Sequence, residues 1–224
     1  MASSRKRIPR EQRKAEIVDA AVKVFAAKGY RSASITDINE SAGIARGTFY
    51  LYFDSKKDVF LEIIESYFKQ YARILEANQE RLEKAFEKGD DPLGSWRENV
   101  FDVLRFHSDN PELADIVYRQ AIGRDEDFSV RFAELAGIAR KKLADGFKLM
   151  ADRGLLRDVD MDVAVSIVIG AAAYITTDQI LREKRTDLKK LADEFVDNQI
   201  RALASPRIDP EKAIEASKAG RAAK

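Results

Sequence analysis

The chain has 224 residues, of which 45% are hydrophobic and 34% are charged, so it can bury a core and still cover its surface with charge. It contains no cysteine and one histidine. This excludes disulfides and cysteine nucleophiles and argues against a zinc or iron site, so we expect no metal and no cofactor. Residues 1–60 hold 12 Lys/Arg against 7 Asp/Glu, whereas the rest holds 27 against 31. A basic head on a mildly acidic body suggests a polyanionic partner such as nucleic acid.

The N-terminal sequence MASSRKRIPREQRKAEI contains no apolar run that could act as a signal peptide. The longest stretch without a charge, residues 163–177, has 15 residues. A membrane span needs roughly 20 apolar residues, so this stretch predicts a buried core helix. We therefore expect a cytoplasmic protein without a membrane segment.

Apolar residues at helical spacing predict an all-α fold of about nine helices, the first over residues 11–28. Gly29 should end that helix in a left-handed conformation. The sequence Ser34-Ile35-Thr36-Asp37 fits a capping box and should begin a short second helix that ends at Ala42, before Gly43. A third short helix is expected over residues 46–53, and Ser55 should cap a long fourth helix.

Further helices are expected over residues 93–107, 111–122, 128–153, 161–183 and 187–203. Residues 206–224 are polar and rich in Ala and Lys, which predicts a disordered or loosely attached tail. The chain should therefore consist of a basic arm and helix-turn-helix domain over residues 1–55, a larger helical domain over residues 56–205, and the tail.

Two short helices joined by a glycine-containing turn are the pattern of a helix-turn-helix unit. Phe49 and Phe53 should pack inward, which leaves Arg46, Gly47 and Thr48 at the start of the third helix facing outward. Such a helix enters the major groove, where Arg reads guanine and a Thr methyl suits thymine. Contacts to phosphate oxygens are expected from the hydroxyl and ammonium groups of Tyr50, Tyr52 and Lys56. The alternative is a plain packing motif of a helical protein.

Residues 14–61, KAEIVDAAVKVFAAKGYRSASITDINESAGIARGTFYLYFDSKKDVFL, closely resemble the DNA-binding domain of TetR-family transcriptional regulators. The resemblance covers about a fifth of the chain and implies an all-helical homodimer whose C-terminal domain senses a small molecule. Two positions depart from the family pattern: Ala45 where members often have a Ser cap, and Leu51 where a polar or aromatic residue is common. The resemblance implies DNA contacts at Ser34, Thr36, Arg46, Gly47, Thr48, Tyr50, Tyr52 and Lys56.

Residues 163–175 are apolar or small on every face, so a helix there must be covered on all sides. A second apolar stripe follows in the next helix. We expect the helices at 161–183 and 187–203 to pair with their copies in a homodimer, although burial of both in one large monomeric core is the alternative. The second stripe consists of Leu188, Leu191, Ala192, Phe195, Ile200 and Leu203.

Aromatic and apolar residues of the larger domain, with a few polar ones, could line a cavity for a mostly apolar effector. Core packing is the alternative for each of them, and His107 should bond backbone groups at a helix end. The candidate lining residues are Trp96, Phe101, Leu104, His107, Val117, Tyr118, Gln120, Phe147, Met150, Tyr174 and Thr177.

Three functions remain to be compared. The first is a dimeric regulator, acting as a repressor, that a small molecule releases from a palindromic double-stranded DNA operator. The second is an enzyme on a helical bundle, which the absence of a Ser/His/Asp set and of a phosphate-binding loop disfavours, so we assign no catalytic residue. The third is an architectural or partner-binding helical protein that does not switch.

Overall fold

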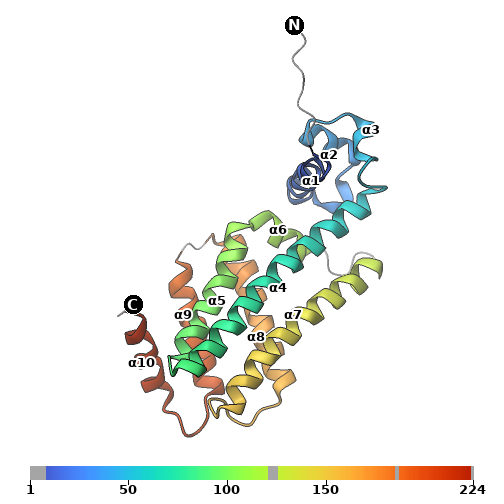
Figure 1. The fold of residues 1–224 in the computed structure, drawn as a ribbon. Coiled ribbons are helices and arrows are strands. Elements are labelled where there is room, and N and C mark those ends of the chain that lie inside the picture. The colour runs from blue at the N-terminus through green and yellow to red at the C-terminus, as the bar shows by residue number, and fades with distance from the viewer. Residues whose placement is uncertain (1–8, 121–125, 185–186, 223–224) are drawn as a thin grey trace. The chain divides into compact units, whose positions relative to one another are not determined.

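The computed structural model describes residues 9–120, 126–184 and 187–222. Within these ranges every regular element is a helix, apart from one isolated bridge between Leu156 and Ala204 (Figure 1). The predicted all-α fold is therefore confirmed. The chain divides into two compact units. One comprises Met1–Tyr67 with Glu112–Phe132, and the other comprises Phe68–Pro111 with Ala133–Lys224.

The first unit contains the predicted pair of short helices. Its helices are α1 (Arg10–Ser32), α2 (Ile35–Ala42), α3 (Arg46–Phe49), the first turns of α4 (Lys56–Lys88), most of α6 (Pro111–Asp115) and the π-helical segment η1 (Ile116–Gln120). The core of this unit is aromatic and aliphatic and excludes solvent. Its fully buried members include Ile17, Phe25, Ile38, Phe49 and Phe60.

Two glycines shape this unit as the sequence predicts. Gly29 has a φ of 74° and interrupts α1, although one more turn then extends to Ser32 instead of ending at residue 28. Gly43 closes α2 with a φ of 63°, and its N–H donates to the carbonyls at the end of that helix. The third helix is shorter than expected, because the regular helix ends at Phe49. From there i to i+3 hydrogen bonds carry the chain to Tyr52 and an i to i+4 bond reaches Phe53.

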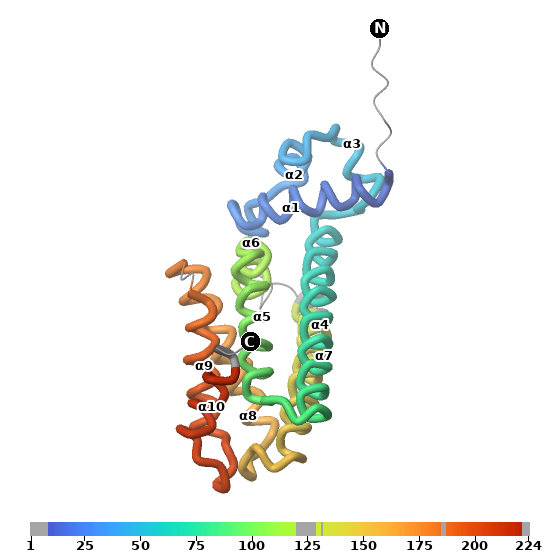
Figure 2. Tube along the Cα trace, turned by 60° about the vertical axis from the view of Figure 1, so that its left-hand side comes forward, coloured from blue at the N-terminus to red at the C-terminus, as the bar shows by residue number. Residues whose placement is uncertain are grey.

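The second unit is a bundle in which α9 lies beside both α5 and α10 (Figure 2). Its main core joins residues of six helices, α4, α5 and α7–α10, around Trp96, Phe147 and Phe195. The predicted helix ends agree with the structure to within two residues. Besides the later turns of α4, its helices are α5 (Pro92–Asp109), most of α7 (Glu126–Asp152), α8 (Met161–Ile175), the π-helical segment η2 (Thr176–Arg182), α9 (Leu188–Leu203) and α10 (Pro210–Ala222).

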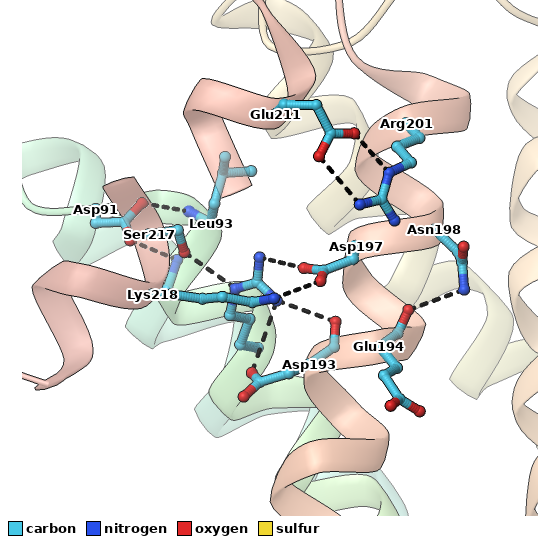
Figure 3. A network of polar contacts seen from close by, with 12 residues as sticks. Asp91, Leu93, Asp193, Glu194, Asp197, Asn198, Arg201, Glu211, Ser217 and Lys218 are labelled. Carbon is cyan, nitrogen blue, oxygen red and sulfur yellow. Dashed lines mark hydrogen bonds and ion pairs between the residues drawn. The ribbon is translucent and has the colours of Figure 1, made fainter. Parts of the chain in front are cut away.

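The expectation of a loose polar tail is wrong, because residues 210–222 form α10 and dock against α5 and α9. The fully buried Arg97 of α5 donates from Nε to Ser217 Oγ over 3.1 Å and pairs with Asp197 Oδ1 at 2.6 Å. Lys218 Nζ lies 2.6 Å from the other oxygen of the same carboxylate. Figure 3 shows Lys218 of α10 reaching Asp197 of α9, with Ser217 on the same helix. Polar contacts of this kind leave no periodic apolar signal in the sequence.

The apolar stripe expected to pair α9 with a second copy is also misassigned. Leu191, Phe195 and Ile200 are buried within their own chain, against α5, α8 and α10. The opposite face of α9 is polar. Apolar surface stays exposed on α8, where Val163 is 53% exposed and Ile167 is 59% exposed.

One helical run among the described residues, Met161–Arg182, is long and apolar enough to cross a membrane by length and composition alone. It is longer than the 15-residue uncharged stretch, because η2 continues α8 without a break. Only 28% of its apolar window is buried inside the chain. A helix that packs on one side against its own core and on the other against a partner meets the same criteria.

Candidate nucleic-acid interface and effector region

The start of α2 is fixed by the predicted capping box. Ser34 Oγ accepts from the Asp37 backbone N–H at 3.1 Å, and Asp37 Oδ2 accepts from the Ser34 N–H at 2.9 Å. Lys28 pairs with the same carboxylate at 2.6 Å, and this hydrogen bond together with those of Ser34 lowers the pKa of Asp37 to about 2. The hydroxyl of Ser34 therefore holds the cap, whereas Thr36 lies exposed on the first turn.

Helix α3 presents its first residues to solvent. Ala45 makes no side-chain cap, as its departure from the family pattern predicts. Arg46 and Gly47 are exposed, and the Arg46 guanidinium makes no hydrogen bond or ion pair with any described residue. A Cβ built on Gly47 would meet no atom within 4 Å, so nothing inside the chain requires a glycine there. Thr48 is half-buried, and Phe49 anchors the helix in the core.

The turns after α3 continue this exposed surface. Tyr50 is 49% exposed and Leu51 is 69% exposed, whereas Tyr52 is half-buried. Arg10, at the start of α1, lies 5.8 Å from the centre of the Tyr52 ring and donates to the Leu51 carbonyl over 3.4 Å. A cation beside this surface was not singled out from the sequence, because α1 and α3 are far apart along the chain. Residues 1–8, the rest of the basic arm, lie outside the described residues.

Lys56 does not reach outward as expected for a phosphate contact. Its ammonium group donates to the backbone carbonyls of Tyr30 at 2.7 Å and Ala33 at 2.8 Å, and to that of Arg31 at 3.4 Å. The same nitrogen lies 4.5 Å from the centre of the Tyr30 ring. Partial burial lowers the pKa of Lys56. The residue therefore caps the end of α1, and its assignment to phosphate from the sequence does not fit this geometry.

Several predicted effector residues are core residues of the second unit. Trp96 and Phe147 meet edge to face with ring centres 5.6 Å apart, and Met150 belongs to the same cluster. Leu104 and Phe101 belong to a smaller cluster with α9, and Arg105 lies over the Phe101 ring at 5.6 Å. The alternative of core packing therefore describes these five residues in the structure.

His107 is buried near the end of α5. Its Nδ1 lies 3.2 Å from Thr176 Oγ1, and its ring stacks on Tyr71 with centres 5.8 Å apart. Burial lowers the pKa of His107 to about 4, so the imidazole is neutral at pH 7. This pair places a polar group inside an otherwise apolar region.

The remaining predicted effector residues are not brought together with these. Tyr174 is 69% exposed on α8, and the Thr177 hydroxyl donates to carbonyls of its own helix. Val117 is buried in the first unit, where Tyr118 shares a hydrogen bond of 3.5 Å with Tyr67. The side chain of Gln120 lies outside the described residues. Among the described residues no group of three or more His, Asp or Glu could hold a metal ion.

The arrangement of α2, Gly43 and α3 is that of a helix-turn-helix with its aromatic core inside and Arg46 outside. The sequence profile described as "Bacterial regulatory proteins, tetR family" matches residues 17–63, which contain all of these elements. The predicted likeness to TetR-family regulators is therefore confirmed over residues 17–63. The prediction of a DNA-binding transcriptional regulator is thereby confirmed at the level of the family, and TetR-family proteins are regulators and not enzymes.

The similarity to known proteins also extends beyond residues 17–63. A protein of Escherichia coli K12 named "Probable acrEF/envCD operon repressor" is 28% identical over 199 residues, covering 83% of this chain and 84% of that protein. The transcriptional regulator FadR of Bacillus subtilis in complex with stearoyl-CoA superposes with a TM-score of 0.69 at 20% identity, covering 83% of this chain and 97% of that one. A SmeT–triclosan complex gives a TM-score of 0.71 at 19% identity, covering 87% and 93%. At such identities the two structures establish the fold.

Proposed function

We propose that this TetR-family chain is a dimeric repressor that binds a palindromic operator and is released by a small, mostly apolar effector. The observation that carries the proposal is the exposed surface of α2 and α3 above a buried aromatic core. The relationship to a repressor that spans most of both chains supports repression. Such a protein acts where the DNA is, so we assign it to the cytoplasm.

We assign DNA contact to the outward residues of α2, α3 and the turn that follows. Arg46 suits the acceptor pair of guanine, and Gly47 allows the backbone to approach the groove. Tyr50 offers a hydroxyl suited to phosphate oxygens, which position a protein without specifying sequence. The proposed contact residues are Thr36, Arg46, Gly47, Thr48, Tyr50 and Tyr52, with Ser34 acting through its cap on α2.

Two heads are needed to occupy a palindrome, with half-sites about 34–36 Å apart. The exposed apolar face of α8 supports a two-fold interface centred on that helix, in which Ser166 and Gly170 permit close approach. The polar outer face of α9 makes it a smaller contributor than the sequence suggested. We accordingly assign DNA binding to residues 1–55, and dimerisation and effector binding to residues 56–205.

The apolar interior of the second unit supports a mostly apolar effector. Stearoyl-CoA and triclosan, the ligands in the two structurally similar complexes, are both of this kind. The pair of His107 and Thr176 would supply a polar contact in such a site. An effector could release DNA only by binding one arrangement of the heads better than the other.

The test begins with selection of binding sequences from a pool of randomised DNA duplexes by the purified protein. We expect a two-fold symmetric sequence to be enriched and its binding to weaken steeply with salt. Stearoyl-CoA and triclosan are then added as probes of two apolar classes. Release of the selected duplex by either one supports the proposal. Enrichment of no sequence would favour an architectural protein that does not switch.

A further inference from the structure

We propose that Lys56 is a positioning residue for DNA recognition. Its hydrogen bonds attach the connection between α1 and α2 to the first turn of α4, and this attachment holds the exposed surface of α2 and α3 in place. This inference rests on the proposed function, because it concerns how the head is oriented for DNA. It assigns to Lys56 a role that does not involve phosphate.

The hydrogen bonds of Lys56 use all the donors of its ammonium group. A lysine ammonium has three N–H donors and no acceptor. Three backbone carbonyls surround Nζ of Lys56, those of Tyr30, Arg31 and Ala33, two of them within 2.8 Å. Contact with a phosphate would withdraw donors from these carbonyls, and leaving partly buried acceptors without a partner costs free energy.

An aromatic ring lies beside the ammonium group of Lys56. Nζ of Lys56 lies 4.5 Å from the centre of the Tyr30 ring, within cation–π range. That ring is held on its other sides by Phe25 at 5.6 Å and Phe60 at 4.6 Å. Phe25 belongs to α1 and Phe60 to α4, so both helices fix the Tyr30 ring on which the ammonium group of Lys56 lies.

The three carbonyls lie at the C-terminal end of α1, which ends at Ser32. No further turn of that helix follows to supply backbone N–H partners for them. Lys56, the first residue of α4, supplies those partners from another helix. Ser34 and its capping box follow directly, so the position of this turn sets where α2 begins.

Together these contacts join three elements at one point. The ion pair of Lys28 and Asp37 is a second link between α1 and α2. The Lys28 side chain is 53% exposed, so salt screens this pair. Lys56 is better shielded, so it is the link that persists at the salt concentrations at which DNA is bound. Loss of Lys56 should loosen α2 and α3 relative to α4 without removing a phosphate contact.

The test compares Lys56→Met and Lys56→Arg with the wild-type protein on the selected operator duplex, across a salt series from about 50 to 200 mM. Lys23→Met is the matched control, because it removes the same charge from an exposed site on α1. Circular dichroism confirms that each protein is folded at the assay temperature. If Lys56→Met does not fold, Lys56→Gln, which keeps two donors, replaces it.

We expect Lys56→Met to raise Kd by roughly tenfold beyond the change in Lys23→Met, with the slope of log Kd against log salt unchanged relative to that control. Lys56→Arg should not rescue binding, because a planar guanidinium cannot aim donors at the same three carbonyls. A slope smaller by about one unit, with rescue by Lys56→Arg, would identify a phosphate contact and overturn the inference. An unchanged Kd in Lys56→Met would also overturn it. Failure of the wild-type protein to select any duplex would instead reject the proposed function.

Discussion

Arg46 and Lys56 carry the same charge in very different surroundings. Arg46 is exposed and bonds no described residue, whereas Lys56 donates to three carbonyls and lies on an aromatic ring. A guanidinium that is not engaged within its own chain can move to a base edge at little cost. An engaged ammonium would first have to break several bonds. The exposure and the hydrogen bonds of a basic residue therefore indicate whether it reads a base or positions the backbone, which its residue type alone does not indicate.

The role of Arg46 can be tested by Arg46→Ala. If it reads a base, the variant should lose about 1–3 kcal/mol of discrimination at one position of each half-site, because the bidentate contact is gone. Binding to a panel of operators with single base-pair changes measures this loss. Arg207→Ala, which removes an exposed arginine from the second unit, should keep the wild-type preference. An equal loss of affinity for all sequences would make Arg46 a phosphate contact.

His107 should make stability depend on pH. Its pKa is about 4 in the folded chain, against about 6.5 when unfolded, because burial disfavours the imidazolium. Between these values the unfolded chain binds a proton that the folded chain does not, so stability is present above pH 6.5 and is lost as the pH falls toward 4. The loss is on the order of 3 kcal/mol, from 1.36 kcal/mol per unit of pKa.

Urea unfolding of the wild type and of His107→Gln at pH 7 and pH 4.5 measures this contribution. Glutamine is polar and does not titrate, so the variant should lose less stability between the two values than the wild type loses. Carboxylates titrate in both proteins and cancel in the comparison. Parallel losses in the two proteins would show that His107 does not titrate in this range.

At the scale of elements, α10 shows how a polar helix can be held on a protein. Arg97 is fully buried and has Asp197 as its nearer carboxylate partner at 2.6 Å, with Asp193 at 3.6 Å, whereas Lys218 reaches the Asp197 carboxylate from a half-exposed position. Asp197→Ala should therefore cost about 3–5 kcal/mol, because it leaves a buried cation without its close partner. Lys218→Ala should cost no more than about 1 kcal/mol.

Urea denaturation of both single variants gives these two values. The double variant Arg97→Met with Asp197→Leu is the informative control, because it removes both charges and keeps apolar volume at the site. It should be more stable than Asp197→Ala. If Asp197→Ala is no worse than Lys218→Ala, the buried pair does not hold α10.

The elements that sequence patterns predict well are those with local causes. Gly29 and Gly43 have the left-handed conformation that ends a helix, and the Ser34–Asp37 capping box has its partners within three residues. The docking of α10 could not be predicted, because Arg97 and Ser217 are 120 residues apart and their contact is polar. Periodicity located the apolar stripe of α9 correctly, but it could not reveal that α5, α8 and α10 cover it.

The same distinction applies to the candidate sites. The exposed residues of α3 could be predicted because Phe49 and Phe53 fix which side of a short helix faces inward. The position of Lys56 depends on carbonyls that are 23 or more residues away along the chain. The predicted effector residues share an apolar character with the core, so sequence alone cannot separate lining from packing. Their division between two compact units followed only from the structure.

At the scale of the whole molecule, α8 carries a stripe of apolar side chains that the chain leaves uncovered. Val163, Ile167 and Tyr174 are all more than half exposed. They follow a spacing of four and then seven residues, which places them on one side of the helix. Apolar patches of this kind on a water-soluble protein mark interaction sites. A second copy would cover the stripe and would also supply the second head that a palindrome requires.

Ile167→Glu tests this interface, because it places a charge in the middle of the exposed stripe. We expect sedimentation velocity at micromolar concentration to show a monomer, with the wild type sedimenting as a dimer. The monomer should still fold, since Ile167 is 59% exposed in the single chain, and its melting should show no loss beyond that caused by dissociation. Operator affinity should fall steeply, because each head would then bind alone and the gain from joining two half-site contacts would be lost.

Lys190→Glu on the exposed face of α9 is the matched control and should remain dimeric with operator affinity close to that of the wild type. A dimeric Ile167→Glu together with a monomeric Lys190→Glu would move the interface to α9, the second of the two helices that the sequence predicts to pair.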